Sequence, residues 1–228
     1  MKERGMIFNA EMVRAILDGR KTQTRRIMKP QPTPCTLQKG GHWWPSNVFK
    51  TMLHIEEEMQ NGKGGWGGLV GDACPFGDVG DRIWVRETFQ GPLVSEDLLE
   101  EYRAYPEKFE KPQYCEYAAD GGARPEYCDL DDNLRHGWLP SIHMPRWASR
   151  ILLEITDVRV ERLASISQED AAKEGYPANP EPYGGSMDKW LWFRQLWDSI
   201  YPEQSFSHNP WVWVIEFKRV EGARYEQF

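Results

Sequence analysis

The sequence lacks the features that would place it in a membrane, in a secretory route or in a disordered class. No run of residues approaches the roughly 20 apolar positions that a membrane-spanning helix needs. The segment from Met1 to Gly5 leads into an apolar run of only three residues, so we expect no secretory signal peptide. Charged residues make up 28% and apolar residues 40% of the 228-residue chain, which is typical of a folded globular protein. We therefore predict a cytoplasmic protein without membrane contact.

Cysteines are few, and their spacing does not favour zinc. The four cysteines are Cys35, Cys74, Cys115 and Cys128, and none of them forms the close Cys-x2-Cys pair of compact zinc motifs. In a reducing compartment they are expected to be mostly buried free thiols. A structural metal bound with the help of His42 is the alternative. We predict no metal site and no cofactor.

The charge of the chain is unevenly distributed. Asp and Glu number 35 against 28 Lys and Arg, and this excess of acid argues against a simple cationic surface for nucleic acid. The segment from Arg20 to Lys29 is the exception, because it carries five positive charges and no acidic residue. A small positive pocket on an acidic body suits a compact base or nucleoside better than a long phosphate backbone. A solvated basic loop is the alternative interpretation of the same segment.

Tryptophan is abundant, with 11 residues, and two uses of it are expected. Trp211 and Trp213 are predicted in the core, and Trp190 and Trp197 are predicted to pack a helix against a sheet. The remaining candidates lie in predicted loops, where they either fill the insertions or stack on a base: Trp43, Trp44, Trp66, Trp138 and Trp147.

Hydrophobic periodicity predicts strands and helices in mixed order. Strands are expected at 6–8, 82–89, 114–118, 150–163 and 211–219. Helices are expected at 10–18, 46–60, 95–103, 168–174 and 186–200, the first after the N-cap Asn9 and the fourth after a capping box at Ser167. The strand at 211–219 is apolar on both faces, as in a barrel or a sheet flanked by helices. The pattern predicts an α+β fold, a small barrel with helices at its rim.

Residues 16–26, Ile-Leu-Asp-Gly-Arg-Lys-Thr-Gln-Thr-Arg-Arg, resemble the signature of the ASCH domain in the PUA-like superfamily. Further segments fit in order: Gly80-Asp81 before a strand, the short acidic helix from Ile166 to Gly175, and the closing strand Trp213 to Phe217. The whole chain also resembles ASCH-containing proteins of phages and prophages. The resemblance implies one domain over residues 1–228, a PUA-like β-barrel with flanking helices and two long insertions at about 31–77 and 90–147.

This resemblance also implies a function. Small bacterial ASCH proteins hydrolyse N4-acetylcytidine to cytidine and acetate with a Lys, a Thr and a Glu, which fall here on Lys21, Thr24 and Glu174. Amide hydrolysis needs a nucleophile, a proton acceptor and groups that stabilise the oxyanion. Lys21 is the candidate base, and the neighbouring arginines are expected to lower its pKa. Glu174 either holds that base or protonates the leaving amine, and either Thr24 or a water attacks.

The same motif supplies the candidate substrate-binding residues, which are Arg20, Thr22, Arg25 and Arg26. Arg25 stands where the small enzymes commonly have an apolar residue. Two other function classes stay open at this point. One is an RNA- or DNA-binding module, with or without ribonuclease activity, that contacts nucleic acid through residues 20–29. The other is a phage-encoded interaction protein that keeps the fold and blocks a host factor.

Overall fold

The computed structural model describes residues 1–36, 40–60, 68–128, 133–180, 185 and 187–221. Trp66 and Ser186, the expected first residue of a helix, lie outside the described residues. No helix in the described ranges is long and apolar enough to cross a bilayer.

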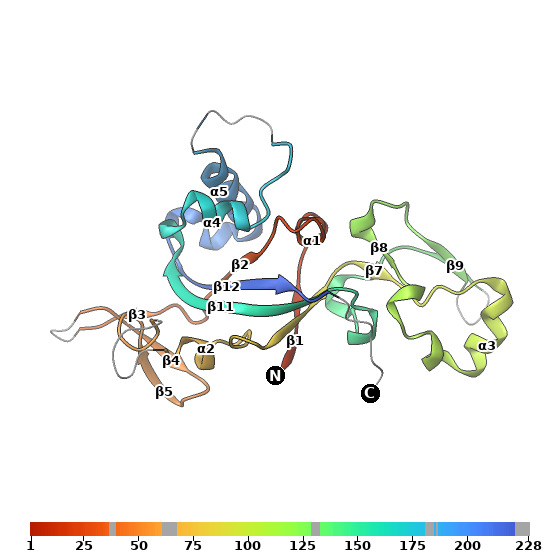
Figure 1. The fold of residues 1–228 in the computed structure, drawn as a ribbon, viewed down its shortest axis with the longest axis horizontal. Coiled ribbons are helices and arrows are strands. Elements are labelled where there is room, and N and C mark those ends of the chain that lie inside the picture. The colour runs from red at the N-terminus through yellow and green to blue at the C-terminus, as the bar shows by residue number, and fades with distance from the viewer. Residues whose placement is uncertain (37–39, 61–67, 129–132, 181–184, 186, 222–228) are drawn as a thin grey trace.

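Helices and strands are mixed along the chain, which confirms the α+β class (Figure 1). The α-helices are α1 (Ala10–Leu17), α2 (Val70–Ala73), α3 (Leu99–Ala104), α4 (Gln168–Lys173) and α5 (Asp188–Ile200). The longer strands are β1 (Glu3–Ile7), β2 (Gln23–Ile27), β4 (His42–Ser46), β5 (Thr51–His54), β6 (Arg82–Arg86), β11 (Leu152–Arg162) and β12 (Trp211–Arg219). The shorter strands are β3 (Thr33–Pro34), β7 (Phe89–Gln90), β8 (Glu116–Tyr117), β9 (Glu126–Cys128) and β10 (Leu134–His136).

A five-stranded sheet in the order β1-β6-β11-β12-β2 forms the centre of the molecule. β1 runs parallel to β6, and the other neighbours pair antiparallel. The long strand β11 changes register against β12 between Ile155 and Asp157, and such a bulge bends a strand and increases its twist. Figure 1 shows β11 and β12 as two long curved strands side by side.

The closed barrel expected from the sequence is not observed. Within the described residues, β1 and β2 are the two edges of the sheet, and no strand pairing joins them. A side chain spans the two edges instead, because Arg26 Nη2 donates to the carbonyl oxygen of Ile7 at 2.8 Å. The two edge strands therefore come within reach of one arginine side chain but do not pair with each other.

Strand β12 is covered on both faces, as its apolar pattern predicts. Trp211, Trp213, Ile215 and Phe217 belong to one hydrophobic core together with α1, β4 and β5. Alternate residues of the strand belong to a second core under α4 and α5, which also contains Phe193 and Trp197. The central sheet therefore carries helices α4 and α5 on one face and the hairpin of β4 and β5 on the other.

The two helices next to the candidate motif begin at the predicted caps. Asn9 Oδ1 accepts a hydrogen bond from Met12 N at 2.8 Å at the start of α1. Ser167 Oγ accepts one from Asp170 N at 3.0 Å at the start of α4. Each cap satisfies one of the N–H groups that a helix leaves unpaired in its first turn. These caps fix the residues at which both helices start.

The helix expected at 46–60 is wrong. Residues 42–54 form the antiparallel pair β4 and β5, in which Trp44 lies opposite Leu53. Trp44 is buried and packs edge-on against Trp213, with ring centroids 5.5 Å apart. The turn between the strands includes Lys50 at φ 56°, a left-handed conformation that ends any helix. Trp44 therefore fills the space between the first insertion and the sheet.

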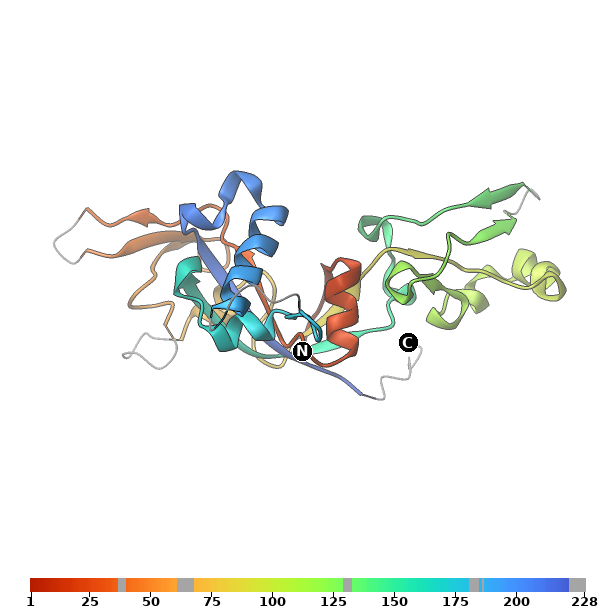
Figure 2. The same ribbon diagram turned by 90° about the horizontal axis from the view of Figure 1, so that it is seen from above.

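Residues 88–128 and 133–148, here called the insertion lobe, lie across α1 from α4 and α5 (Figure 2). The lobe holds α3, the pair β7 and β8, and the pair β9 and β10. Its small core consists of Phe89, Tyr117, Met144 and Ala148, with Trp147 packed against them. Arg14 of α1 donates to the carbonyl oxygen of Ala119 at 3.0 Å and fastens the lobe to the helix.

Candidate active site

The middle of the motif at residues 16–26 is held against the end of helix α4. Lys21 N donates to the carbonyl oxygen of Ala15 at 2.9 Å, which folds the chain back on α1. Thr22 N then donates to the carbonyl oxygen of Lys173 at 2.9 Å, and Lys21 and Glu174 form an isolated β-bridge. Backbone hydrogen bonds therefore place Lys21 beside Glu174, although 153 positions separate them in the sequence.

The side chains of Lys21 and Glu174 form a buried ion pair. Lys21 Nζ lies 2.8 Å from Glu174 Oε2 and 2.8 Å from the carbonyl oxygen of Glu174. The exposed fraction of the side chain is 0% for Lys21 and 3% for Glu174. A cation at the end of a helix also offsets the unfavourable position of Glu174, the C-cap residue of α4.

Arg25 holds the second oxygen of the same carboxylate. Its Nη1 lies 3.0 Å from Glu174 Oε1, and its side chain is 1% exposed. The same guanidinium donates to Gln23 and is paired with Glu161 and Asp170 at 3.4 and 3.5 Å. The glutamate is therefore shared by two cations, one on each oxygen.

Burial lowers the pKa of Lys21 from its usual value of 10.5, because the ammonium group has lost its hydration. Glu174 raises that pKa in part through its charge and its hydrogen bond. Arg26 and Arg25 lower it further, as the sequence predicts for neighbouring cations. The net effect is an amine that gives up its proton more readily than an exposed lysine.

A glycine is required directly after the glutamate. Gly175 has φ 106°, a left-handed conformation that side chains rarely adopt. A Cβ at this position would lie 3.0 Å from Ala15 Cβ and 3.4 Å from Lys21 Cβ. The close approach of α4 to α1 that buries Lys21 therefore depends on Gly175.

Thr24 reaches the site from a different direction. Side chains alternate along β2, so Thr24 shares a face with Arg26, whereas Lys21 and Arg25 share the other. In the part of the chain that the structure describes, no hydrogen bond joins Thr24 to Lys21 or Glu174. β2 is an edge strand, however, and Thr24, Arg25 and Glu174 line one small cavity beside it. Lys21 therefore contacts Glu174 directly but lines neither of the two cavities, whereas Thr24 shares only the wall of the small cavity with Glu174.

Two cavities adjoin Glu174. The outer cavity has a volume of about 400 Å³ and is walled by α1, α5 and the segment after α4, including Arg20 and Trp192. The inner cavity, of about 20 Å³, lies between β2 and α5. Met12, Glu174 and Leu196 line both. Glu174 is therefore part of the wall of both cavities.

The remaining candidate binding residues have structural partners. Arg20 donates to the carbonyl oxygens of Gly175 and Tyr176 at 3.2 and 3.0 Å and pairs with Asp18 at 2.8 Å. Thr22 lines neither of the two cavities, and its backbone holds α4 and β12. Arg26 lies over the ring of Phe8, in addition to its bond to Ile7. Of these three residues, Arg20 and Arg26 line a cavity wall.

The expected positive pocket is not a free cationic surface. Lys21 and Arg25 are buried in ion pairs, Arg20 and Arg26 are half-buried and bound to backbone oxygens, and Lys29 is exposed. Lys21 and Arg25 are neutralised by carboxylates that lie far away in the sequence, whereas Arg20 pairs with the nearby Asp18. That distance explains why the segment looked unpaired in the sequence.

Sequence reasoning missed a layer of polar residues behind the site. Gln23 Nε2 donates to Asp170 and Glu216 at 3.2 and 2.9 Å. Arg159 lies 3.2 Å from Asp170 and 2.7 Å from Glu216, and it also contacts Asp157 and Glu161. One signal was available, because Asp157, Arg159 and Glu161 alternate on one face of the predicted strand at 150–163. This layer holds Arg25 and α4 in place.

Metal ligands do not gather in the described ranges, where no group of three or more His, Cys, Asp or Glu side chains is placed to hold an ion. His42, the expected helper, uses both ring nitrogens elsewhere, at 2.7 Å from Glu56 and 3.1 Å from Arg162. All four cysteines are free thiols, but the expectation that most of them are buried is wrong. Cys74 is buried, Cys35 and Cys115 are half-buried, and Cys128 is exposed.

The site therefore consists of one buried carboxylate shared by a lysine and an arginine, beside a threonine and two adjoining cavities. When the chain is compared with known proteins, no family model, no curated protein and no solved structure matches it.

Proposed function

We propose that the protein is a hydrolase of a modified nucleobase or nucleoside, and that it deacetylates N4-acetylcytidine to cytidine and acetate. The proposal includes the ASCH-like, PUA-like assignment of the curved sheet. The observation that carries it is the buried Lys21–Glu174 pair, whose member Glu174 lines a cavity of about 400 Å³. A buried charged pair beside a cavity is costly to stability and is a common property of catalytic sites.

The proposed reaction needs only the residues of this cluster. A hydroxyl oxygen, from water or from Thr24, bonds to the acyl carbon while the C–N bond of the amide breaks. If Thr24 attacks, water then releases the acetate from its ester. The proton of the attacking hydroxyl passes to Lys21 or Glu174, and a proton from this pair reaches the leaving amine. Arg25 adds positive charge near the oxyanion that develops.

The outer cavity suits a nucleoside in size and lining. Ligand sites for small molecules commonly span about 300–1,000 Å³ and combine apolar walls with a few polar groups. Trp192 contributes an aromatic surface on which a base can stack, and Arg20 and Asp18 contribute polar groups. Trp192 is itself held edge-on by Tyr176, with ring centroids 5.5 Å apart.

A small substrate fits the charges better than a polynucleotide does. Binding of a nucleic acid backbone needs several free cations that neutralise phosphates. In the segment from Arg20 to Lys29, Lys21 and Arg25 are buried and paired with carboxylates. We therefore place nucleic-acid binding second, as an outcome that the experiment below can show.

The test is direct product detection. Purified protein is mixed with N4-acetylcytidine and followed by proton NMR for acetate and cytidine, and in parallel with labelled RNA and DNA. The proposal predicts acetate release that Glu174→Gln and Lys21→Met abolish, and no nucleic-acid cleavage. Absence of acetate together with a salt-dependent RNA or DNA complex would replace the enzyme by the binding module.

A further inference from the structure

The inner cavity has the chemistry of a site for a short acyl group. Six of its lining side chains are apolar or aromatic: Met12, Phe193, Leu196, Trp197, Ile200 and Tyr201. Four polar residues, Thr24, Arg25, Arg26 and Glu174, complete the lining. An apolar pocket with polar groups in its wall matches a group that has a carbonyl at one end and a methyl at the other.

An unsatisfied donor adds a second, independent observation. Arg25 Nε and Arg26 Nε, from two residues that line this cavity, are buried without a hydrogen-bond partner among the described residues. Arg25 is the more deeply buried of the two residues, and its Nη1 and Nη2 are paired. A buried N–H without a partner is rare in folded proteins and calls for an explanation. A carbonyl oxygen at the edge of the inner cavity, with its methyl group inside, would satisfy the Arg25 N–H.

The size of the inner cavity limits what enters. A volume of about 20 Å³ is enough for one group of the size of a water molecule, and a methyl group is comparable. Met12 and Leu196 line both cavities, so they stand where the inner and outer spaces meet. A group that passes from the outer cavity into the inner one passes these two side chains and Glu174.

We propose that the inner cavity is an acyl subsite, in which Arg25 Nε–H binds the carbonyl oxygen and Leu196 limits the acyl chain to acetyl length. The inference rests on the proposed function, because it names the acyl group that the same site accepts. It assigns the outer cavity to the nucleoside and the inner cavity to the group that is removed. The scissile bond then lies beside Glu174, which both cavities share.

The first test is a comparison of acyl chains. Wild-type protein is expected to hydrolyse N4-acetylcytidine at least about tenfold faster than N4-butyrylcytidine, as the cost of extra methylenes in a closed pocket predicts. Leu196→Ala is expected to shrink this ratio by about tenfold. Leu191→Ala, a change of the same type on the same helix but outside both cavities, is the matched control and keeps the wild-type ratio.

A second test does not depend on turnover. Acetamide and butyramide are titrated separately, and the indole N–H resonance of Trp197, assigned with Trp197→Phe, is followed by NMR. Acetamide is expected to shift this resonance in the wild type, and butyramide only in Leu196→Ala. Trp44, which packs in the other core, is the internal control.

The outcomes separate the two proposals. No acetate from N4-acetylcytidine, with the acetamide shift of Trp197 intact, overturns the proposed function and keeps the acyl subsite. Equal hydrolysis of acetyl and butyryl substrates overturns the subsite and keeps the function. An unshifted Trp197 resonance with either amide, or a ratio that Leu196→Ala leaves unchanged, also overturns the subsite.

Discussion

Two glutamates, Glu174 and Glu87, lie in different regions of the molecule, and both are buried and paired with an arginine. Each is nearly inaccessible, with 3% and 1% exposure, and each is paired with an arginine. Glu174 lies at the end of α4 under the helical face of the sheet, whereas Glu87 lies where the sheet meets the insertion lobe. Burial and pairing alone would rank them equally as functional candidates.

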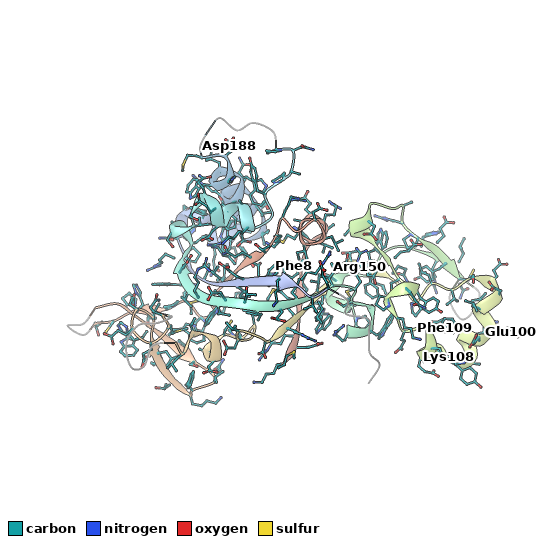
Figure 3. All side chains as sticks on the ribbon, in the orientation of Figure 1. Phe8, Glu100, Lys108, Phe109, Arg150 and Asp188 are labelled. Atoms are coloured by element: carbon teal, nitrogen blue, oxygen red, sulfur yellow. The ribbon has the colours of Figure 1, made fainter. Side chains whose placement is uncertain are left out.

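Their partners differ in kind. Arg150 donates hydrogen bonds to both oxygens of Glu87, at 2.9 and 3.0 Å, and to both oxygens of Asp120. The guanidinium of Arg150 also lies 3.9 Å over the ring of Tyr117. Figure 3 labels Arg150 at the junction between the central sheet and the lobe. Glu87 is thus part of an ion-pair cluster that joins the central sheet to the insertion lobe, and it lines neither of the two cavities.

Glu174 is instead shared by two different side chains, Lys21 and Arg25. Its two oxygens bind different cations, one of which is a lysine whose pKa burial has lowered, and Glu174 lines two cavities. The difference indicates which features to test: Glu174 lines cavities and has a partner with a lowered pKa, and Glu87 has neither. The predictions below test that distinction.

The largest expected effect is on turnover. Glu174→Gln is expected to lower acetate release about a hundredfold or more, the range for loss of a general acid or base. Glu87→Gln is expected to leave the rate per folded molecule unchanged, although both variants lose about 3 kcal/mol of unfolding free energy, as broken buried pairs do. Acetate release and urea unfolding are measured on both. An equal loss of rate in the two variants would contradict the distinction between Glu174 and Glu87.

The second prediction concerns the coupling within the shared cluster. Lys21→Met is expected to cost about 3 kcal/mol of unfolding free energy, because Glu174 keeps only Arg25. The double variant with Glu174→Gln is expected to cost less than the sum of the single changes, since Lys21 and Glu174 contact each other directly. Urea unfolding of the four proteins measures the coupling. Additive losses would show that the pair does not act as a unit.

The third prediction is that Glu87 and Asp170 change the stability of the protein in opposite directions as the pH falls. Burial raises the pKa of Glu87 above 4.5 despite Arg150, so the folded protein binds this proton more tightly than the unfolded chain. The stability of the wild type relative to Glu87→Gln should therefore rise as the pH falls through the raised pKa toward 4.5. Unfolding free energies of both proteins between neutral pH and pH 4.5 measure this trend.

Asp170, behind the candidate site, should behave in the opposite way. Its partial burial raises its pKa, but Arg25, Gln23, Arg159 and Lys173 outweigh this and hold the pKa below 3.8. Stability relative to Asp170→Asn is therefore present above pH 3.8 and lost as the pH falls through the lowered pKa. If the stability relative to the variant changed with pH in the same direction for Glu87 and Asp170, these assignments would be contradicted.

The smallest expected effects come from the helix caps. Asn9→Ala at α1 and Ser167→Ala at α4 each remove one cap and should lower the unfolding free energy by about 1 kcal/mol. Asn9→Asp and Ser167→Thr retain a capping oxygen and are the controls. Acetate release per folded molecule should stay at the wild-type level in Ser167→Ala and Ser167→Thr, because Ser167 lines neither cavity, whereas Asn9 is part of the outer cavity wall. A large loss of rate in Ser167→Ala would mean that α4 positions the cluster more loosely than the contacts suggest.

Local patterns predicted much of the fold. The caps Asn9 and Ser167 and the alternation at 150–163 and 211–219 marked helices and strands that the structure confirms, because each signal depends on neighbouring residues. The segment 46–60 misled, since Val48, Phe49 and Met52 have helical spacing but lie exposed near the hairpin turn, while Trp44 packs on Trp213. Tertiary contact decided that segment.

For the candidate site, the sequence predicted residue types but not their pairing. Lys21 and Glu174 came from the motif and from an acidic helix, and only the backbone contacts between α1, β2 and α4 show that they touch. The layer of Asp170, Arg159 and Glu216 was hidden because its members lie on three separate elements. The inner cavity depends on α5, which the motif does not include.

The most direct measurement is a crystal structure of Glu174→Gln soaked with N4-acetylcytidine. The central claim predicts the base in the outer cavity and the acetyl carbonyl oxygen within hydrogen-bond distance of Arg25 Nε, with the amide bond beside residue 174. Density for the nucleoside on the insertion lobe, or on the opposite face of the sheet from α4 and α5, would contradict it.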